Sequence, residues 1–528
     1  MKKNETTSSG GENIASLISR AEEYGVPFLE TVTDDMLDPA MVKELPVEWA
    51  RSNLLLPIVM EGEDCVLSAD PDQVNEHEYL SLLLGRELRL IMAAPDLISQ
   101  SIEKCYYSKD DSPEEFMQDF SAQEEHAVVS DASDLLQVAE QAPVTQLVNL
   151  ILLEAVKKKA SDIHFEPYES SLRVRYRVDG VLYEQVSPPK HVEEALVSRL
   201  KVMAHMDIAE KRLPQDGMAR VRVGGREIDI RVSTVPVAEG ERVVLRILDK
   251  DSILFPLDVL GMPKSLHSSF EGLLNESNGI IIVSGPTGSG KTTTLYAALG
   301  RLDSSRRNIL TIENPVEYQL PDIGQIQVKP KIGLTFASGL RHILRQDPDI
   351  ILVGETRDME TAEIAIQASL TGHLVFTTLH TNDAPGAVLR LVDMGVEPYL
   401  LASCLRGVLA QRLVRCLCPV CRREIIAGDE EARKLDSVGG NGAALPGKKI
   451  WVPAGCDECL EGYSGRIGLF ELMEVDEQMQ AVIRESNLDA SALAASAVKG
   501  GMSFLADDGV AKLFAGATSL SEVVTAIG

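Results

Sequence analysis

The sequence predicts an α/β protein of several domains, with a parallel β-sheet in its largest domain. Between about residues 256 and 410, apolar strand-like runs alternate with helical patterns, which is typical of a parallel sheet. A glycine-rich segment, 285–292, lies between such a run and the following helical pattern. The chain has 528 residues, enough for two to four domains that each bury a core.

Changes in pattern along the chain predict the order of its parts. An α/β region over 1–107 precedes an acidic linker over 108–140, and residues 141–255 combine a helix with strands that alternate apolar and charged residues. The parallel-sheet region, 256–410, is followed by a cysteine-containing module and a helical tail, over 411–466 and 467–528. The predicted helices are 14–24, 47–52, 96–106, 144–158 and 292–302; the predicted strands are 55–60, 65–69, 172–178, 219–223, 227–233, 242–248, 280–283, 349–354 and 374–379.

The net charge excludes some partners and leaves others open. Lys and Arg total 51 against 80 Asp and Glu, a formal charge of −29, which argues against nucleic acid as the main partner. Much of this acidity is equally well explained as solvated surface. The sequence contains no apolar run near the ~20 residues of a spanning helix and no signal-peptide pattern, so we expect an intracellular protein.

The strongest motif is a complete phosphate-binding P-loop. It runs Gly285, Pro286, Thr287, Gly288, Ser289, Gly290, Lys291, Thr292. Glycines let successive backbone N–H groups curl around a phosphate at the positive end of the following helix. We expect the Lys291 ammonium to reach the β- and γ-phosphates of a nucleotide and the Thr292 hydroxyl to hold Mg²⁺.

Three further segments place polar side chains after predicted strands. Glu355 ends the run from Asp349, where a carboxylate polarises water or binds Mg²⁺ through water, although an acidic strand cap is the simpler alternative. Glu313 follows a strand-like segment, and its carboxylate, with that of Glu317, could position water or metal. His380 follows the run 374–379, where a histidine is more often structural than in contact with a γ-phosphate.

Four cysteines form two pairs with two-residue spacing. Cys418 and Cys421 make the first pair, and Cys456 and Cys459 make the second. Four thiolates at this spacing favour a closed, tetrahedral, structural Zn²⁺ site, although 34 intervening residues exceed the common spacing. Redox-active pairs are the alternative, and Cys416 is a possible substitute ligand.

In this order and spacing, the motifs resemble those of the traffic ATPases of type II secretion and type IV pilus assembly. The resemblance extends upstream through Ala160–Pro167, Arg175–Gly180 and Leu213–Gly217, and covers roughly residues 40 to 475. It identifies the four nucleotide-site boxes as Walker A (285–292), an aspartate box (311–317), Walker B (349–355) and a histidine box (372–380). The secretion members are more similar to this chain than the pilus-extension members are.

This resemblance implies a RecA-like ATPase domain over 256–410, preceded by an N-terminal docking domain and a second, PAS-like domain. It also implies ATP, Mg²⁺ and Zn²⁺ as cofactors, and a homohexamer in which arginines reach ATP across a cleft between domains. Arg231 and Arg246 are the candidates, with solvated strand arginines as the alternative.

The implied role is a cytoplasmic motor that is peripheral at the inner membrane and powers secretion. Its implied partners are the cytoplasmic domain of an inner-membrane secretion protein and a polytopic platform protein. A pilus-extension ATPase and a nucleotide-binding scaffold with little turnover are the alternatives. The scaffold rests on Asn314, where the family usually has an aspartate.

Overall fold

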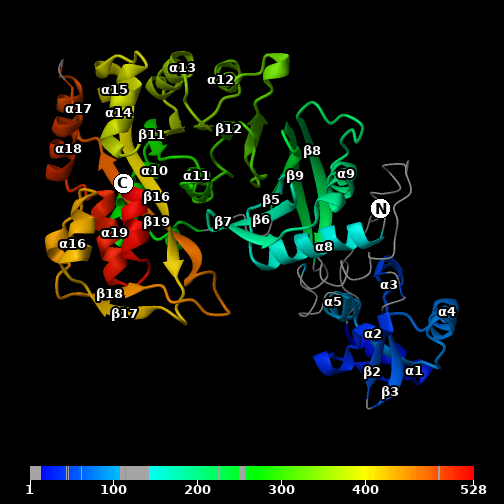
Figure 1. The fold of residues 1–528 in the computed structure, drawn as a ribbon. Coiled ribbons are helices and arrows are strands. Elements are labelled where there is room, and N and C mark those ends of the chain that lie inside the picture. The colour runs from blue at the N-terminus through cyan, green and yellow to red at the C-terminus, as the bar shows by residue number, and fades with distance from the viewer. Residues whose placement is uncertain are drawn as a thin grey trace. The chain divides into compact units, whose positions relative to one another are not determined.

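The computed structural model describes most of the chain. The described residues are 14–42, 45, 47–60, 62–106, 113, 142–223, 226–248, 256–485 and 488–528. Apart from residue 113, the predicted acidic linker lies outside them, as does the polar N-terminus over 1–12. The chain divides into two compact units, Met1–Asp249 and Lys250–Gly528, and each is described by itself (Figure 1).

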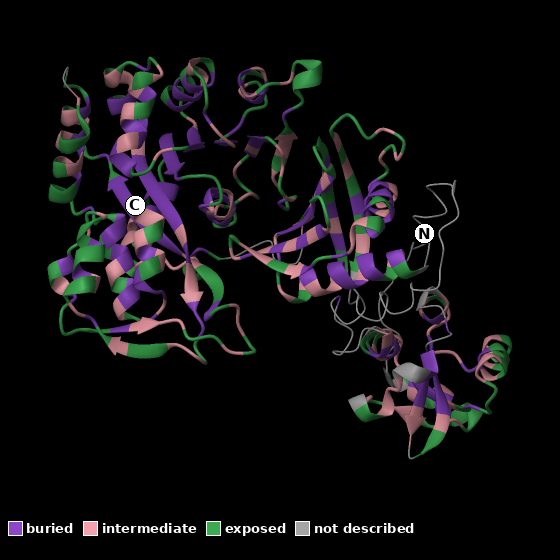
Figure 2. Ribbon diagram, in the orientation of Figure 1, coloured by how far each residue is buried: buried purple, intermediate pink, exposed green. Residues whose placement is uncertain are grey.

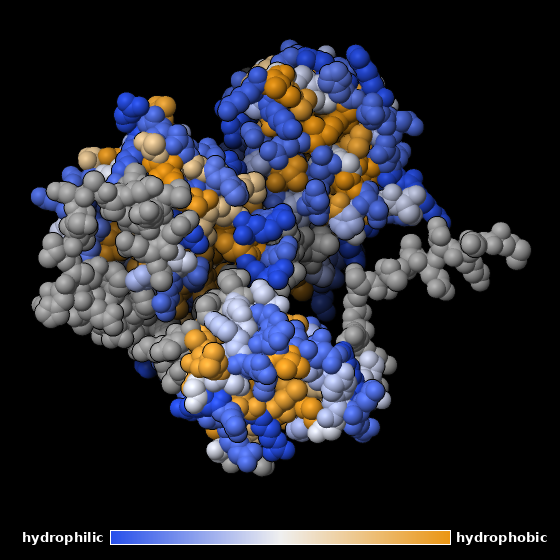
Figure 3. All heavy atoms as spheres, turned by 90° about the vertical axis from the view of Figure 1, so that its right-hand side faces the viewer, coloured by the Kyte–Doolittle hydropathy of each residue, from blue (hydrophilic) through white to orange (hydrophobic). Residues whose placement is uncertain are grey.

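The N-terminal part of the first unit is a four-stranded sheet with helices. Its strand order is β1-β4-β3-β2, with β2 and β3 antiparallel and the other pairs parallel. The strands are β1 (Phe28–Leu29), β2 (Leu55–Met60), β3 (Glu63–Ser68) and β4 (Arg89–Ala93); the helices are α1 (Ile14–Tyr24), α2 (Pro39–Val42), α3 (Val47–Asn53), α4 (Val74–Leu84) and α5 (Pro95–Tyr106). Apolar side chains such as Leu56, Val66 and Ile98 fill the core. Figure 3 shows one face of the molecule, on which apolar and polar residues are interspersed over the coloured surface.

The second part of this unit is a six-stranded antiparallel sheet with the order β7-β6-β5-β10-β9-β8. Its elements are α8 (Ala142–Lys157), β5 (Asp162–Pro167), β6 (Leu172–Val178), β7 (Val181–Val186), α9 (Glu193–Met203), β8 (Gln215–Val223), β9 (Arg226–Val237) and β10 (Gly240–Leu248). Strand β6 alternates buried and half-buried residues, because one face of the sheet packs on a core and the other carries charged side chains (Figure 2). The Tyr176 hydroxyl anchors α8 by donating to the Ile151 carbonyl at 2.8 Å.

The second unit contains a seven-stranded sheet with the order β13-β12-β14-β15-β11-β16-β19. All neighbours are parallel except β16 and β19, which are antiparallel. The strands are β11 (Gly279–Ser284), β12 (Ile309–Glu313), β13 (Gly324–Gln327), β14 (Ile350–Val353), β15 (Leu374–Leu379), β16 (Leu405–Leu417) and β19 (Tyr463–Glu474). The helices are α10 (Lys264–Leu274), α11 (Lys291–Leu299), α12 (Phe336–Ile343), α13 (Met359–Leu370), α14 (Ala384–Asp393) and α15 (Pro398–Cys404).

Strands β11, β14 and β15 are buried along their whole length, because helices cover both faces of the sheet. The predicted boundary at residue 410 falls inside β16, and β19 lies between 463 and 474. The central sheet therefore uses strands from the region assigned to the cysteine module and the tail.

The C-terminal part packs a small hairpin against helices. It comprises β17 (Arg423–Ile426), α16 (Asp429–Asp436), β18 (Lys449–Val452), α17 (Glu477–Ile483), α18 (Ala490–Lys499), α19 (Leu505–Phe514) and α20 (Leu520–Ile527). Leu435 and Ile450 share one apolar core with Leu513 and Val523. The hairpin and helices α19 and α20 are thus joined by a common core.

Candidate functional site

The glycine-rich loop 285–292 connects β11 to α11, as the sequence predicts. Gly288 and Gly290 have φ values of 81° and 87°, which glycine adopts readily and other residues rarely do. At Gly285 a Cβ atom would lie 2.5 Å from both the Gln411 carbonyl oxygen and the Ser289 hydroxyl. The loop is therefore folded tightly against β16, and only glycine fits at its first position.

Lys291 is buried at the start of α11. Its Nζ atom donates to the carbonyl oxygens of Gly285 and Pro286 at 2.8 and 2.9 Å. Burial lowers the pKa of Lys291 to about 8; the Glu355 carboxylate opposes this shift and the Arg412 cation adds to it. Because bringing this cation into the site is costly, a bound polyanion would stabilise it strongly.

Thr292 follows Lys291 in the first turn of α11 and is partly exposed. Within the described residues, its hydroxyl donates to no carbonyl or side chain. This position suits the metal-binding role that the motif predicts.

Glu355 lies just beyond the carboxyl end of β14, two strands from β11 in the sheet. Its side chain is 13% exposed, and Oε2 forms an ion pair with Arg357 Nε at 2.6 Å and lies 3.6 Å from His380 Nε2. Burial and then the Lys291 charge lower the pKa of His380, and Glu355 opposes them. The structure thus brings Glu355, His380 and Lys291 together at one edge of the sheet, where parallel strands end.

Glu313 is placed differently from the other candidates. It is 4% exposed at the end of β12, and its carboxylate accepts hydrogen bonds from Tyr296, Thr311 and Gln325. Burial, followed by the charge of Glu313, raises the pKa of Tyr296 well above its ordinary value. Three internal donors therefore occupy this carboxylate, an arrangement that the sequence does not predict. Glu317 and Asn314 lie nearby on the exposed surface.

Arg231 and Arg246 lie in the first unit, opposite one another on β9 and β10. Arg246 donates from Nε to Asp162 Oδ1 at 2.9 Å while its side chain remains 60% exposed. Arg231 is exposed, and its guanidinium pairs with no carboxylate of the described residues. Both are on the charged face of the six-stranded sheet, as predicted. Met218 stands opposite Arg231 on β8 and adds no charge there.

Two residues of β16 contact the site without any sequence signal. Gln411 Nε2 donates to the Ser289 carbonyl at 2.6 Å. Arg412, 7% exposed, donates to the carbonyls of Asn382 and Ala526 at 2.8 and 3.1 Å. No motif marks them, because their partners are 122, 30 and 114 residues away in the chain. A cavity of about 290 Å³ is lined by Arg412 and by residues 286–289 of the loop, among others.

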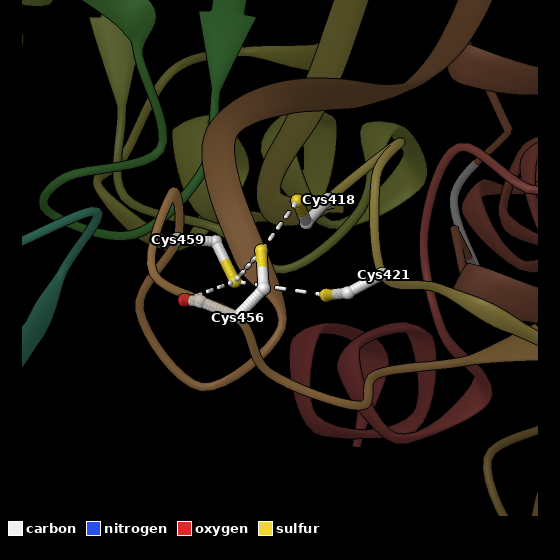
Figure 4. A group of neighbouring side chains, drawn as sticks. All are labelled: Cys418, Cys421, Cys456 and Cys459. Atoms are coloured by element: carbon white, nitrogen blue, oxygen red, sulfur yellow. Dashed lines mark hydrogen bonds between the residues drawn. The ribbon is translucent and has the colours of Figure 1, made fainter.

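The paired cysteines converge on one point, as the spacing predicts (Figure 4). The sulfur atoms of Cys418, Cys421, Cys456 and Cys459 all lie within 4.8 Å of one another, and three of their separations are 3.9, 3.7 and 3.6 Å. Four thiolates bound to Zn²⁺ at ~2.3 Å in a tetrahedron stand roughly 3.8 Å apart. The donor set and the geometry therefore fit a structural zinc ion. Among the described residues, Cys416 is not part of this group.

Comparison with known proteins identifies two regions of the chain. Residues 137–525 match the model of the type II/IV secretion system protein family, and residues 24–112 match the MshEN domain. The Type II secretion system protein E of Dickeya dadantii is 45% identical over 92% of this chain and 97% of its own length. The Type IV pilus assembly ATPase PilB of Myxococcus xanthus is 42% identical over 96% of this chain and 89% of its own length.

Solved structures support the fold of the core. The Legionella pneumophila ATPase DotB matches with a TM-score of 0.53 at 21% identity, covering 72% of this chain and 94% of its own. The predicted multidomain α/β fold and the predicted family are both confirmed. No described helix has the length and apolar character needed to cross a bilayer. The family model covers most of the chain and the protein E relative nearly all of it, so the chain belongs to the type II/IV secretion system protein family.

Proposed function

We propose that this chain is the ATP-hydrolysing cytoplasmic motor of a type II secretion system, powering pseudopilus assembly and protein export across the outer membrane. The observation that carries the proposal is the arrangement at one sheet edge: a complete P-loop with the buried Lys291, and Glu355 beside His380. Relatives known as type II secretion system protein E suggest the cellular role.

The residues divide the chemistry between them. Backbone amides of 285–292 and the Lys291 ammonium bind the phosphates, and the Thr292 hydroxyl would hold Mg²⁺, which neutralises phosphate charge when bound. Glu355 polarises the water that attacks the γ-phosphorus, and the proton of that water passes to the carboxylate. The bond between the γ-phosphorus and the β–γ bridging oxygen breaks, with ADP as the leaving group. His380 and Arg357 hold that carboxylate in position through its Oε2 atom.

Arg231 and Arg246, which belong to the unit Met1–Asp249, would complete the proposed site in a ring of subunits. A homohexamer would bring these cations to the γ-phosphoryl group, where charge must be neutralised during transfer. Asp162 holds Arg246 at 2.9 Å, so this guanidinium is oriented on the sheet before it meets a phosphate.

Binding to partner proteins would hold this chain at the inner membrane. The N-terminal domain would bind the cytoplasmic domain of an inner-membrane secretion protein, and the ring would act on a polytopic platform protein. Full-length protein should co-purify with that cytoplasmic domain, whereas a chain lacking residues 1–107 should not. Retained co-purification would move the docking site elsewhere.

The tetracysteine cluster is proposed to bind one structural Zn²⁺. Its four sulfur ligands leave no open position for substrate, so the metal would stabilise the fold without taking part in hydrolysis. Metal analysis of purified protein should give one zinc per chain.

One observation favours a second function, that of a pilus-extension ATPase. The pilus assembly relative covers 96% of this chain at 42% identity, so the two roles share the same architecture. Deleting the gene and scoring secreted enzymes and surface pili separates them, because each role predicts the loss of only one.

Phosphate release tests the enzymatic proposal against a nucleotide-binding scaffold. Wild type should release phosphate from MgATP, and the rates of Lys291→Ala and Glu355→Gln should be at least 100-fold lower. Lys331→Ala, at an exposed lysine, is the matched control and should retain the rate. Equal rates in wild type and Lys291→Ala would refute hydrolysis at this loop.

A further inference from the structure

The residues on either side of Glu355 are held by the two strands that neighbour β14. The Gly354 amide donates to the Ile312 carbonyl of β12 at 2.8 Å, and a Cβ atom at Gly354 would lie 3.2 Å from that oxygen. The Thr356 amide donates in the other direction, to the Thr378 carbonyl of β15, at 3.0 Å. Backbone hydrogen bonds therefore continue past the end of β14 and enclose Glu355.

Two threonines of β15 add side-chain hydrogen bonds to the same residues. The hydroxyl oxygens of Thr377 and Thr356 lie 2.7 Å apart, and the Thr378 hydroxyl donates to the Gly354 carbonyl at 2.7 Å. All three threonines are buried, at no more than 6% exposed. Because successive side chains of a strand point to opposite faces, these two bonds hold the residues beside Glu355 from both faces of the sheet.

The strand that carries these threonines also leads to His380. That residue follows Thr378 by two positions, and its Nε2 atom lies 3.6 Å from Glu355 Oε2. The hydroxyl bonds therefore fix the Glu355 carboxylate relative to the strand end from which His380 projects. Such support matters to a group that must orient water, since a displacement of about 1 Å in a reacting group can cost roughly 100-fold in rate.

Packing alone does not account for hydroxyl groups at these buried positions. Valine has nearly the same shape as threonine, so it would fill the same space without a polar atom. Burying a hydroxyl is favourable only when a hydrogen-bond partner compensates for the lost water. The hydroxyls of Thr356, Thr377 and Thr378 have such partners, and each partner belongs to a residue next to Glu355 or to β15.

We propose that Thr356, Thr377 and Thr378 are positioning residues for hydrolysis, which hold the Glu355 carboxylate where it polarises the attacking water. The inference rests on the proposed function, because these hydroxyls act only through Glu355. They bond to the Glu355 segment and to one another, so nucleotide binding does not require them. Their loss should therefore lower the rate of the chemical step and leave the affinity for MgATP unchanged.

Replacing one hydroxyl without changing the side-chain shape tests this role. Thr378→Val should lower kcat for phosphate release at least about tenfold, with KM for MgATP changed by less than about twofold. Thr378→Ser keeps the hydroxyl and should restore most of the rate. Thr361→Val is the matched control, because Thr361 is 1% exposed in the same unit and its hydroxyl has no partner among the described residues; this variant should match wild type.

A double-mutant cycle shows whether the threonine acts through the carboxylate. Phosphate release is measured in single turnovers, with protein in excess over MgATP, so that slow variants can be compared. Thr378→Val should add no further loss to Glu355→Gln, because the group that it positions is already absent. Independent contributions would instead multiply, and the double variant would be about tenfold slower than Glu355→Gln.

The remaining outcomes separate the inference from the proposed function. A wild-type rate in Thr378→Val, a raised KM with unchanged kcat, or a loss that persists in full in Glu355→Gln would overturn the positioning role and leave the proposed function intact. A wild-type rate in Glu355→Gln would overturn the proposed role of Glu355 and this inference with it. Thr356→Val removes the bond on the opposite face, and the same comparisons decide the matter with that variant if thermal unfolding shows that Thr378→Val is not folded.

Discussion

Nucleotide binding should take up a proton at Lys291. Burial lowers the pKa of its ammonium to about 8 in the free protein, so about half of the molecules carry a neutral lysine at pH 8. Phosphate oxygens next to Nζ favour the charged form and raise its pKa in the complex. The bound state therefore holds more protons than the free state around this pH, and affinity must fall as pH rises through 8.

The magnitude follows from that pKa. Binding at pH 8 should take up about half a proton per site, and affinity at pH 9 should be about tenfold weaker than at pH 7. Titration calorimetry with a non-hydrolysable ATP analogue and Mg²⁺ measures the uptake, because the heat varies with the ionisation enthalpy of the buffer.

The second titratable group at this edge of the sheet provides the control. The pKa of His380 is lowered from its ordinary value, so the free imidazole is neutral at pH 8 and could accept a proton from the medium when phosphates bind. The His380→Gln variant should still take up half a proton if Lys291 is the acceptor. Heat that does not depend on the buffer, or uptake that disappears in His380→Gln, would refute the reasoning.

Three further predictions address the other groups. Glu313→Gln replaces a carboxylate that accepts three hydrogen bonds with an amide that carries its own donor, so the free energy of unfolding, measured by denaturation, should fall by about 1–3 kcal/mol. Slower hydrolysis at unchanged stability would instead indicate a role of Glu313 at the nucleotide. Cys456→Ser should remove one zinc per chain and destabilise the second unit by on the order of 4 kcal/mol, as expected for releasing a closed loop of this length, and unchanged zinc content would exclude this ligand. Arg246→Ala should slow phosphate release at least 100-fold, whereas Arg222→Ala on the same sheet, where the arginine pairs with Glu227, should not; equal rates would make Arg246 a solvated strand residue.

The parts of the structure that sequence predicts are those set by local pattern. The apolar run before 285 and the glycines after it fix a strand, a tight turn and a helix within about 20 residues. Strands β6 and β10 are also recognisable, because alternation with period two is visible along a half-exposed strand. The paired cysteines are predictable for the same reason, since each pair is a local unit.

The parts that sequence does not predict depend on distant partners. Strand β5 was missed because its polar residues Asp162, His164 and Glu166 are buried beside arginines of β6 and β10, which hides the usual signal. Strands β16 and β19 pair although they lie about 50 residues apart in the chain, and the residue pattern of neither strand predicts this pairing. Glu313 ends a strand that the sequence predicts correctly, and its donor Thr311 lies on that same strand. Its other two donors, Tyr296 of α11 and Gln325 of β13, are on elements that only the fold places beside it.

Strand β16 connects the tetracysteine cluster, the proposed zinc site, to the phosphate-binding loop. The middle of the strand supports the P-loop through Gln411, and its C-terminal end continues to Cys418, whose amide donates to the Gly462 carbonyl near the second cysteine pair. Between them, Arg415 holds the Glu522 carboxylate of α20. A zinc ion bound at the cysteines would therefore also stabilise the strand that holds both the loop and α20. Loss of the metal should loosen α20 first, and only then the phosphate-binding loop, because the loop has its own support from β11 and α11.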